Sequence, residues 1–84
     1  YPNPFNPETT ISFSLPWQAD VQVNVYNDQG QRIRNLVNQN MGPGDFEVTW
    51  NGRDDEGAEV ATGVYLYVIE GPNLRVHKKV TFLK

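Results

Sequence analysis

The sequence predicts an all-β protein, folded as an antiparallel sandwich of six or seven short strands. Apolar and polar residues alternate through several short runs, which is the period expected of strands with one buried face. Glycine, proline and asparagine residues that form turns separate these runs at intervals of about 8–12 residues. Apolar residues nowhere keep helical spacing for long enough to indicate a helix.

The expected strands follow this alternation in chain order. Residues 9–15 place three apolar side chains on one face, and residues 21–26 repeat the pattern after a turn. Residues 31–37 depart from clean alternation, which predicts a bulge or a short strand that breaks near Asn35, and residues 38–44 are interpreted as a polar loop. The remaining strands are expected at residues 46–50, 63–69 and 74–83.

Residues 50–69 organise the rest of the chain. Residues 64–69 are apolar on both faces, so this strand is expected at the centre of a sheet and covered on both sides. Gly63 stands where the chain leaves a polar loop and enters this strand, and we expect it to hold a backbone conformation that other residues resist. The expected core consists of Ile11, Phe13, Val21, Val23, Val25, Phe46, Val48, Trp50, Tyr65, Tyr67 and Val80.

Length and composition indicate a single domain. A chain of 84 residues supports one core, and the three prolines of residues 1–7 predict a stiff, extended segment. We therefore expect a proline-rich lead-in at residues 1–8 and a sandwich at residues 9–84. No cysteine can form a disulfide, and no apolar run approaches the roughly 20 residues of a membrane span. Because the chain begins without methionine, we expect a piece of a longer polypeptide.

Charge is distributed unevenly along the chain. The formal net charge is −3; six of the ten acidic residues lie within residues 45–59, and four of the seven basic residues lie within residues 75–84. Solvated faces are the simplest interpretation of both regions. An acidic domain binds nucleic acid poorly, since neutralising phosphates supplies most of that affinity, so no nucleic-acid partner is expected.

No catalytic residue or cofactor is expected. His77 is the single histidine and stands beside two lysines, without a cysteine, serine or carboxylate at a suggestive spacing. No glycine-rich phosphate loop follows a strand and opens a helix, so nucleotide binding is not expected either.

Calcium binding by the acidic loop is a weaker alternative. The oxygen donors of this loop are Asn51, Asp54, Asp55 and Glu56. Arg53 stands where a calcium loop needs another oxygen donor, and no acidic residue stands five positions after Gly57. Ordinary turn chemistry is therefore favoured, and Arg53 is expected to pin the loop by bridging neighbouring carboxylates or carbonyls.

Four segments of the chain resemble a known family. They are YPNPFNPETTISFSLP at 1–16, VQVNVYNDQGQRIRNLV at 21–37, WNGRDDEGAEVATGVYLYVI at 50–69 and HKKVTFLK at 77–84. They resemble C-terminal sorting domains of the type IX (Por) secretion system and, equally, the related immunoglobulin-like domain of flagellar hook-capping proteins. The long NGRDDEG loop is closer to the hook-capping type. Either resemblance implies an immunoglobulin-like antiparallel β-sandwich of about seven strands.

The sorting resemblance implies a non-catalytic domain that directs a secreted multidomain protein, often an enzyme, across the outer membrane to the cell surface. The partners would be outer-membrane proteins of the secretion machinery and the upstream domains of the same polypeptide, which would first pass through the periplasm. By resemblance, the recognition residues would be Tyr1, Pro2, Asn3, Pro4, Gly63, Val64, Tyr65, Lys78, Lys79, Val80 and Lys84.

Two other functions stay open at the level of sequence. One is a structural or adhesive immunoglobulin-like surface module of the hook-capping type. The other is carbohydrate binding through an exposed Trp17 or through the tyrosines. In each case Lys78 and Lys79 are expected to face solvent on an edge strand, where charged side chains prevent uncontrolled strand pairing.

Overall fold

The computed structural model describes residues 8–83, and every regular element in that range is a strand. The strands are β1 (Thr9–Leu15), β2 (Ala19–Tyr26), β3 (Arg32–Met41), β4 (Gly44–Trp50), β5 (Gly63–Gly71) and β6 (Leu74–Phe82). The all-β prediction is confirmed, with six strands in place of about seven. Within the described residues, no helix is long and apolar enough to cross a membrane.

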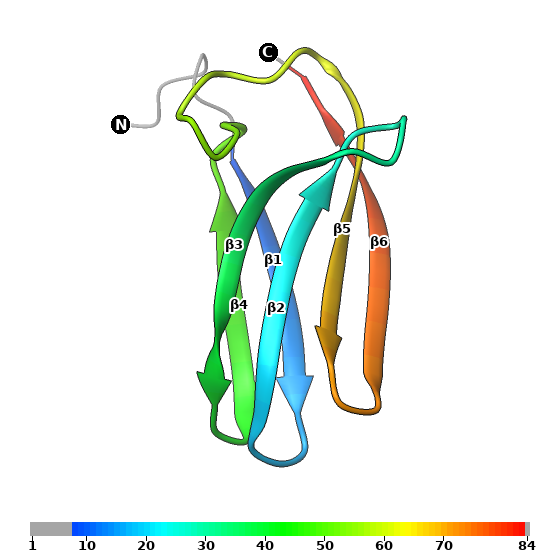
Figure 1. Ribbon diagram of the computed structural model, residues 1–84. Helices are drawn as coiled ribbons and strands as arrows, with labels where there is room; N and C mark the ends of the chain where they lie inside the picture. Colours follow the sequence, from blue (N-terminus) through cyan, green and yellow to red (C-terminus); the bar gives the residue numbers. More distant parts are fainter. Residues whose placement is uncertain (1–7, 84) are drawn as a thin grey trace, which may run out of the picture.

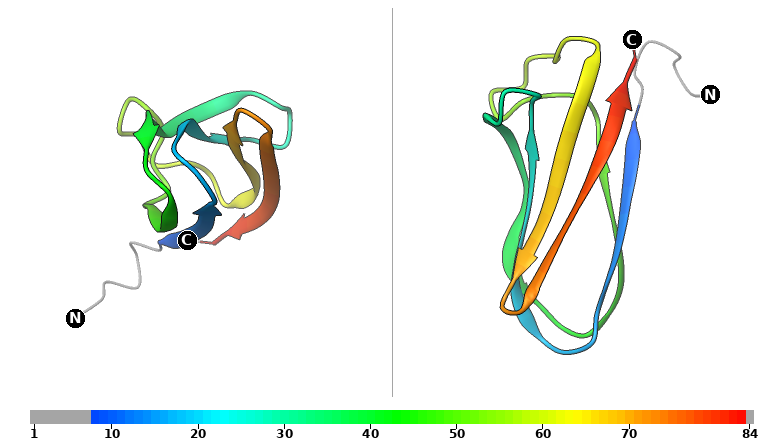
Figure 2. Two further views of the ribbon diagram at one scale, coloured as in Figure 1. Left: turned by 90° about the horizontal axis from the view of Figure 1, so that it is seen from below. Right: turned by 90° about the vertical axis from the view of Figure 1, so that its right-hand side faces the viewer.

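The strands form two antiparallel sheets that face each other (Figures 1 and 2). β1 pairs with β4 in one sheet, and the other sheet has the order β3-β2-β5-β6. β5 therefore lies between two neighbours, as its apolar sequence predicted. β3 and β6 are the edges of the four-stranded sheet, and residues 51–62 carry the chain from the end of β4 to the start of β5.

The core lies between the two sheets. Its buried members are Ile11, Leu15, Ala19, Val21, Val23, Val25, Trp50, Tyr65, Tyr67, Ile69 and Phe82. The ring of Trp50 is fully buried, with its centroid 5.3 Å from that of Tyr65 and 5.1 Å from that of Phe82. Its indole N–H donates a hydrogen bond to the carbonyl oxygen of Arg53 at 3.0 Å, so the polar end of the ring is also satisfied.

Four expected core residues are only half-buried: Phe13, Phe46, Val48 and Val80. The first three lie on β1 and β4, and both strands of a two-stranded sheet are edges, so their inward side chains are open to solvent along one flank. Phe13 and Phe46 are register partners and pack against each other, with ring centroids 5.7 Å apart. The alternation therefore predicted the correct face of these strands but overestimated how deeply that face is buried.

Two tyrosines of β5 carry hydroxyl groups into this core. Burial raises the pKa of the Tyr67 phenol. The pKa of the Tyr65 phenol is also raised, mainly by burial and to a smaller extent by the negative charge of Asp28. The Tyr65 hydroxyl donates a hydrogen bond to the carbonyl oxygen of Ala61, which ties β5 to the preceding loop. Both phenols stay uncharged at neutral pH, as the apolar surroundings require.

Of the two alternatives predicted near Asn35, the structure has the bulge and not the strand break. Val23 pairs with Val37 whereas Asn24 pairs with Asn35, so one residue of β3 is left without a partner. The polar loop predicted for residues 38–44 is wrong, because β3 continues to Met41 in register with β2. Polar side chains are compatible with this strand because β3 is an edge strand whose outer face meets solvent.

Candidate functional site

The outer face of the four-stranded sheet carries an apolar strip that no second layer covers. Val64, Leu66 and Val68 point to this face because they alternate along β5 with the inward-facing core residues. Val64 is 43% exposed, Leu66 is half-buried and Val68 is only 3% exposed, so the strip is open mainly at its Val64 end. The sequence predicted that both faces of this strand would be covered; on the outer face that prediction holds at Val68 and is wrong at Val64. An apolar surface that is open beside a groove is a candidate interaction site.

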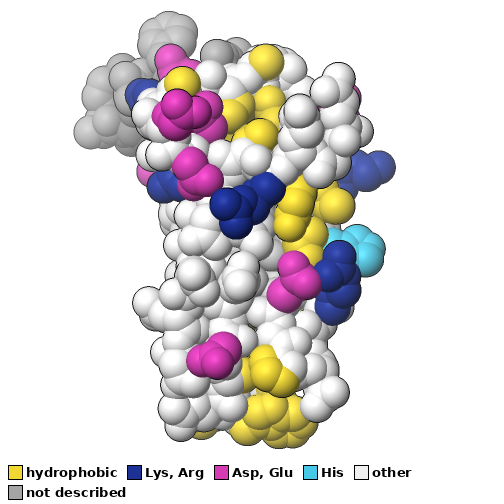
Figure 3. Space-filling view, in the orientation of Figure 1, with side chains coloured by type: hydrophobic (Ala, Val, Ile, Leu, Met, Phe, Trp, Pro, Cys, Tyr) yellow, Lys and Arg dark blue, Asp and Glu magenta, His cyan; other side chains and the backbone are white. Residues whose placement is uncertain are grey.

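The strip forms the floor of a groove with a cavity volume of about 510 Å³. Tyr26 of β2 contributes to its lining, the turn at residues 27–30 lies on the β2 side, and Arg75 and Lys79 lie on the β6 side. Figure 3 shows hydrophobic side chains gathered over β5, with basic side chains and the histidine along the margin formed by β6. The groove therefore combines an apolar floor with a basic border.

The turn beside the groove is held by its own hydrogen bonds. The side-chain oxygen of Asn27 accepts hydrogen bonds from the backbone N–H groups of Gln29 and Gln31, both at 3.0 Å. The backbone N–H of Gly30 donates to the carbonyl of Asn27 at 3.1 Å, and Gly30 has a φ of 80°. A turn fixed in this way gives the groove a preformed wall.

The basic border carries one cation that is free to pair with a ligand. Arg75 forms an ion pair with Glu70 at 2.6 Å, so its charge is already balanced. The ammonium group of Lys79 is exposed and has no hydrogen-bond or ion-pair partner among residues 8–83. A ligand with an apolar group and a neighbouring carboxylate would satisfy both the floor and this lysine.

Three of the residues expected to take part in recognition line this groove: Val64, Tyr65 and Lys79. The ring of Tyr65 points inward, however, and packs against Trp50 and Phe82, so its side chain serves the core. Five others lie outside the described residues: Tyr1, Pro2, Asn3, Pro4 and Lys84. The lead-in predicted for residues 1–8 also lies outside them, except for its last residue.

The structure places Lys78 and Lys79 on opposite faces of β6. Lys79 pairs with Leu66 on the outer face, whereas Lys78 pairs with Tyr67 and points to the inner side. Both are exposed, as predicted, because β6 is an edge strand and the sheets diverge toward the turn between β5 and β6 (Figure 2). Val80 also belongs to the inner face, so only Lys79 of this group reaches the groove.

The expectation for the backbone of Gly63 is wrong. Gly63 is absent from the glycines with positive φ, and a Cβ placed on it would approach nothing closer than 4.0 Å. It is an ordinary first residue of β5, paired with Phe82. The strained position lies earlier, at Gly52, where φ is 76° and a side chain would collide with the ring of Phe82. The chain turns away from the core directly after Trp50, so the backbone conformation with positive φ is needed at Gly52.

The acidic loop uses its oxygens for its own turns. A side-chain oxygen of Asp54 accepts hydrogen bonds from the backbone N–H groups of Glu56 and Ala58, both at 2.9 Å. A side-chain oxygen of Asp55 accepts one from the backbone N–H of Asn35 on β3, at 2.9 Å. Within the described residues, no group of three or more histidine, cysteine, aspartate or glutamate side chains is placed to hold a metal ion. These contacts support turn chemistry over a calcium site.

Arginine side chains complete the anchoring of this loop. Arg53 donates to the carbonyl of Gly57 at 2.8 Å, so it anchors the loop through one carbonyl, where a bridge between two neighbouring acceptors was expected. Arg34 of β3 donates to the carbonyl of Arg53 at 3.0 Å. An isolated antiparallel bridge pairs Arg53 with Glu59.

Sequence reasoning missed the other residues of the groove, which are Tyr26, Leu66, Val68, Arg75 and the turn at residues 27–30. One signal could have found them. A two-sided apolar strand needs cover on both faces, and too few strands were available to build a third layer. An uncovered apolar face was therefore the consistent expectation.

The two facing antiparallel sheets define an immunoglobulin-like β-sandwich. The chain belongs to the family of FlgD Ig-like domains, which matches residues 3–73. The solved structure of FlgD from P. aeruginosa matches with a TM-score of 0.72 and 22% sequence identity, over 87% of this chain and 62% of that chain. The chain thus spans about three-fifths of that solved chain, and the likeness shows the fold. A search of curated proteins found no match.

Proposed function

We propose that this immunoglobulin-like module is a non-catalytic sorting domain, which directs a longer secreted protein across the outer membrane to the cell surface. The observation that carries the proposal is the apolar outer strip of β5, which is open at Val64 and half-open at Leu66 beside the unpaired Lys79. The resemblance of the YPNPFNP, GVYLYVI and HKKVTFLK segments to type IX sorting domains supports the same function.

The groove suits recognition by a protein of the secretion machinery. Apolar anchors that fill a preformed pocket supply most of the affinity of a protein interface, and charges at its margin set encounter rate and specificity. The floor at Val64 and Leu66 would receive an apolar side chain of the partner, and Lys79 would pair with a carboxylate. No step of this function requires a reactive group, a metal or a cofactor.

The second candidate is a structural module of the hook-capping type. Membership of the FlgD Ig-like family favours this structural module, because the match covers most of the chain and the description of the family does not mention export. A structural module would contact neighbouring domains and would not need to be read by a transport machinery. The two functions therefore differ in whether the domain alone can change the location of an unrelated protein.

An export assay separates the two candidates. The domain is fused behind a periplasmically exported reporter in a host with a type IX system, and the reporter is measured in the periplasm and outside the cell. A sorting domain is expected to move most of the reporter outside, whereas the reporter alone stays in the periplasm. A folded fusion that remains in the periplasm would contradict the sorting function and favour the structural module.

Deleting β6 from the fused domain would not test recognition alone. Phe82 at the end of β6 is buried against Trp50, so removing residues from Arg75 onward opens the core as well as the groove. Substitutions at exposed positions keep the fold and the recognition surface separable.

A further inference from the structure

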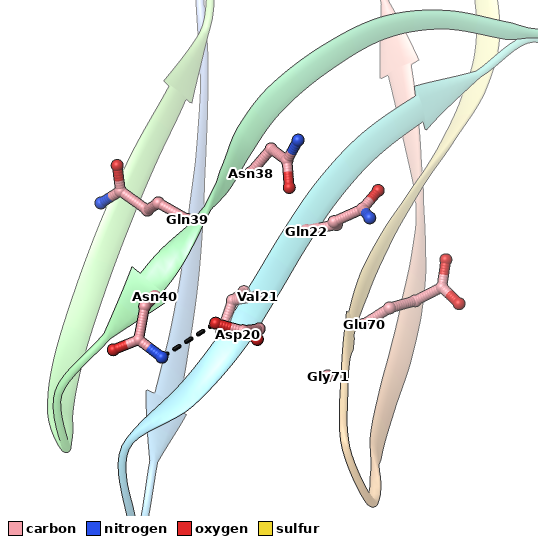
Figure 4. A pocket seen from close by; sticks show the side chains of 8 residues that line it. All are labelled: Asp20, Val21, Gln22, Asn38, Gln39, Asn40, Glu70 and Gly71. Carbon is pink, nitrogen blue, oxygen red and sulfur yellow. Dashed lines mark hydrogen bonds between the residues drawn. The ribbon is translucent and has the colours of Figure 1, made fainter.

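We propose that a second, polar groove on the same sheet binds a neutral glycan. This groove lies near the turn between β5 and β6 and has a cavity volume of about 420 Å³. Side chains from three strands line it, and Figure 4 shows Asn38, Gln22 and Glu70 side by side, with Asn40 and Asp20 below them. The register confirms the rows, since Gln22 pairs with both Asn38 and Glu70, and Asp20 pairs with Asn40.

The amide of Gln22 is held in place by a buried hydrogen-bonded chain. The side-chain N–H of Asn35 donates to the side-chain oxygen of Asn24 at 2.7 Å, and the N–H of Asn24 donates to the oxygen of Gln22 at 3.3 Å. Asn24 is only 3% exposed, although its place in the alternation predicted an outward-facing polar residue. Because the Gln22 oxygen accepts from below, its NH₂ group is directed outward as a donor.

A second chain fixes the carboxylate on the other side. Gln18 donates a hydrogen bond to the side-chain oxygen of Asn40, and the N–H of Asn40 donates to an oxygen of Asp20 at 2.8 Å. The other carboxylate oxygen of Asp20 has no hydrogen-bond partner among the described residues. Donor and acceptor groups thus face the groove in orientations that are set before any ligand arrives, which reduces the entropy lost on binding.

The chemistry of this lining favours hydroxyl groups over charged ligands. Amides and carboxylates pair with hydroxyls as both donors and acceptors. The carboxylate of Asp20 would repel phosphate or uronate groups, whereas the charge of Glu70 is balanced by Arg75 at 2.6 Å.

The proposal is tested by titrating the domain with sugars while recording NMR spectra. The probes are cellohexaose, mannohexaose and xylohexaose, with hexagalacturonate as the charged comparison. We expect one neutral probe to shift the side-chain amide signals of Gln22 and Asn38, and the polyuronate to shift neither. Asn38→Ala is expected to weaken this binding by about fivefold, the effect of losing one neutral hydrogen bond.

Gln39→Ala is the matched control for that substitution. Gln39 is the next residue of β3, is also exposed and also borders the cavity, but Figure 4 shows its side chain pointing away from the two rows. We expect Gln39→Ala to leave the affinity unchanged. The proposal is overturned if no neutral probe shifts the two amide signals at about 10 mM, a concentration well above the dissociation constant of a weak specific site. It is also overturned if both alanine variants weaken binding equally. Neither result bears on export, which depends on the other groove.

Discussion

Replacing Trp50 with alanine is expected to lower the free energy of unfolding by about 3–5 kcal/mol, the range found when a large aromatic side chain is removed from a core. Trp50 is fully buried and packs against the rings of Tyr65 and Phe82, so the substitution leaves a cavity in the core. The substitution also removes the hydrogen bond to the carbonyl of Arg53. Urea unfolding measured by circular dichroism gives the change directly.

The second tryptophan provides the control. Trp17 is 58% exposed in the turn before β2, so Trp17→Ala is expected to change stability by less than about 0.5 kcal/mol. Equal losses for the two variants would contradict the assignment of Trp50 to the core, and a loss below about 1 kcal/mol for Trp50→Ala would do so alone.

Gly52→Ala is expected to destabilise the domain by about 2–5 kcal/mol, through a backbone cost and a collision that add together. Gly52 has a φ of 76°, which a residue with a side chain adopts reluctantly. A Cβ at this position would lie 1.9 Å from the nearest ring atom of Phe82, so the ring must move out of its place beside Trp50. Thermal and urea unfolding both report the loss.

Gly57→Ala separates the two contributions. Gly57 has a φ of 87°, but nothing lies within 4 Å of a Cβ placed on it. It therefore carries the backbone cost alone, which is about 1–2 kcal/mol. A Gly52→Ala variant no less stable than Gly57→Ala would show that Phe82 does not pack against Gly52. If the collision is real, adding Phe82→Leu to Gly52→Ala should cost less than the sum of the two single changes.

The regular parts of the fold could be predicted from alternation alone. The inward positions of β2 and the end of β4 follow the period of two directly, because each strand has one buried face. The bulge opposite Asn24 was also visible, because two successive apolar residues, Leu36 and Val37, cannot both face inward without an extra residue. The alternation of side chains is a local property of the sequence, and it was sufficient to predict these inward positions and the bulge.

The predictions that failed concern features that depend on contacts between distant segments of the chain. The position that requires glycine is set by the distance from Gly52 to Phe82, which are 30 residues apart in the chain and meet only in the fold. The burial of Asn24 depends on a hydrogen bond from Asn35 on another strand. Lys78 and Lys79 are both exposed on an edge strand, as expected, but strand alternation directs them to opposite faces. Of the candidate site, Val64 and Lys79 were predicted, and the wall formed by the turn at residues 27–30 was not.

The central claim is that a partner reads the groove on the outer face, and two neighbouring lysines test it. Lys79→Glu reverses the free charge at the groove, and Lys78→Glu makes the same change on the opposite face of the same strand. Both side chains are exposed, so neither substitution should affect stability by more than about 0.5 kcal/mol, which unfolding of each fusion verifies.

The decisive measurement is the fraction of reporter outside the cell for these two fusions in the export assay. The groove account predicts that Lys79→Glu retains most of the reporter in the periplasm, because the reversed charge repels the carboxylate of the partner, while Lys78→Glu exports it as the unchanged domain does. Equal export by both folded variants, or equal retention of both, would contradict recognition at this groove.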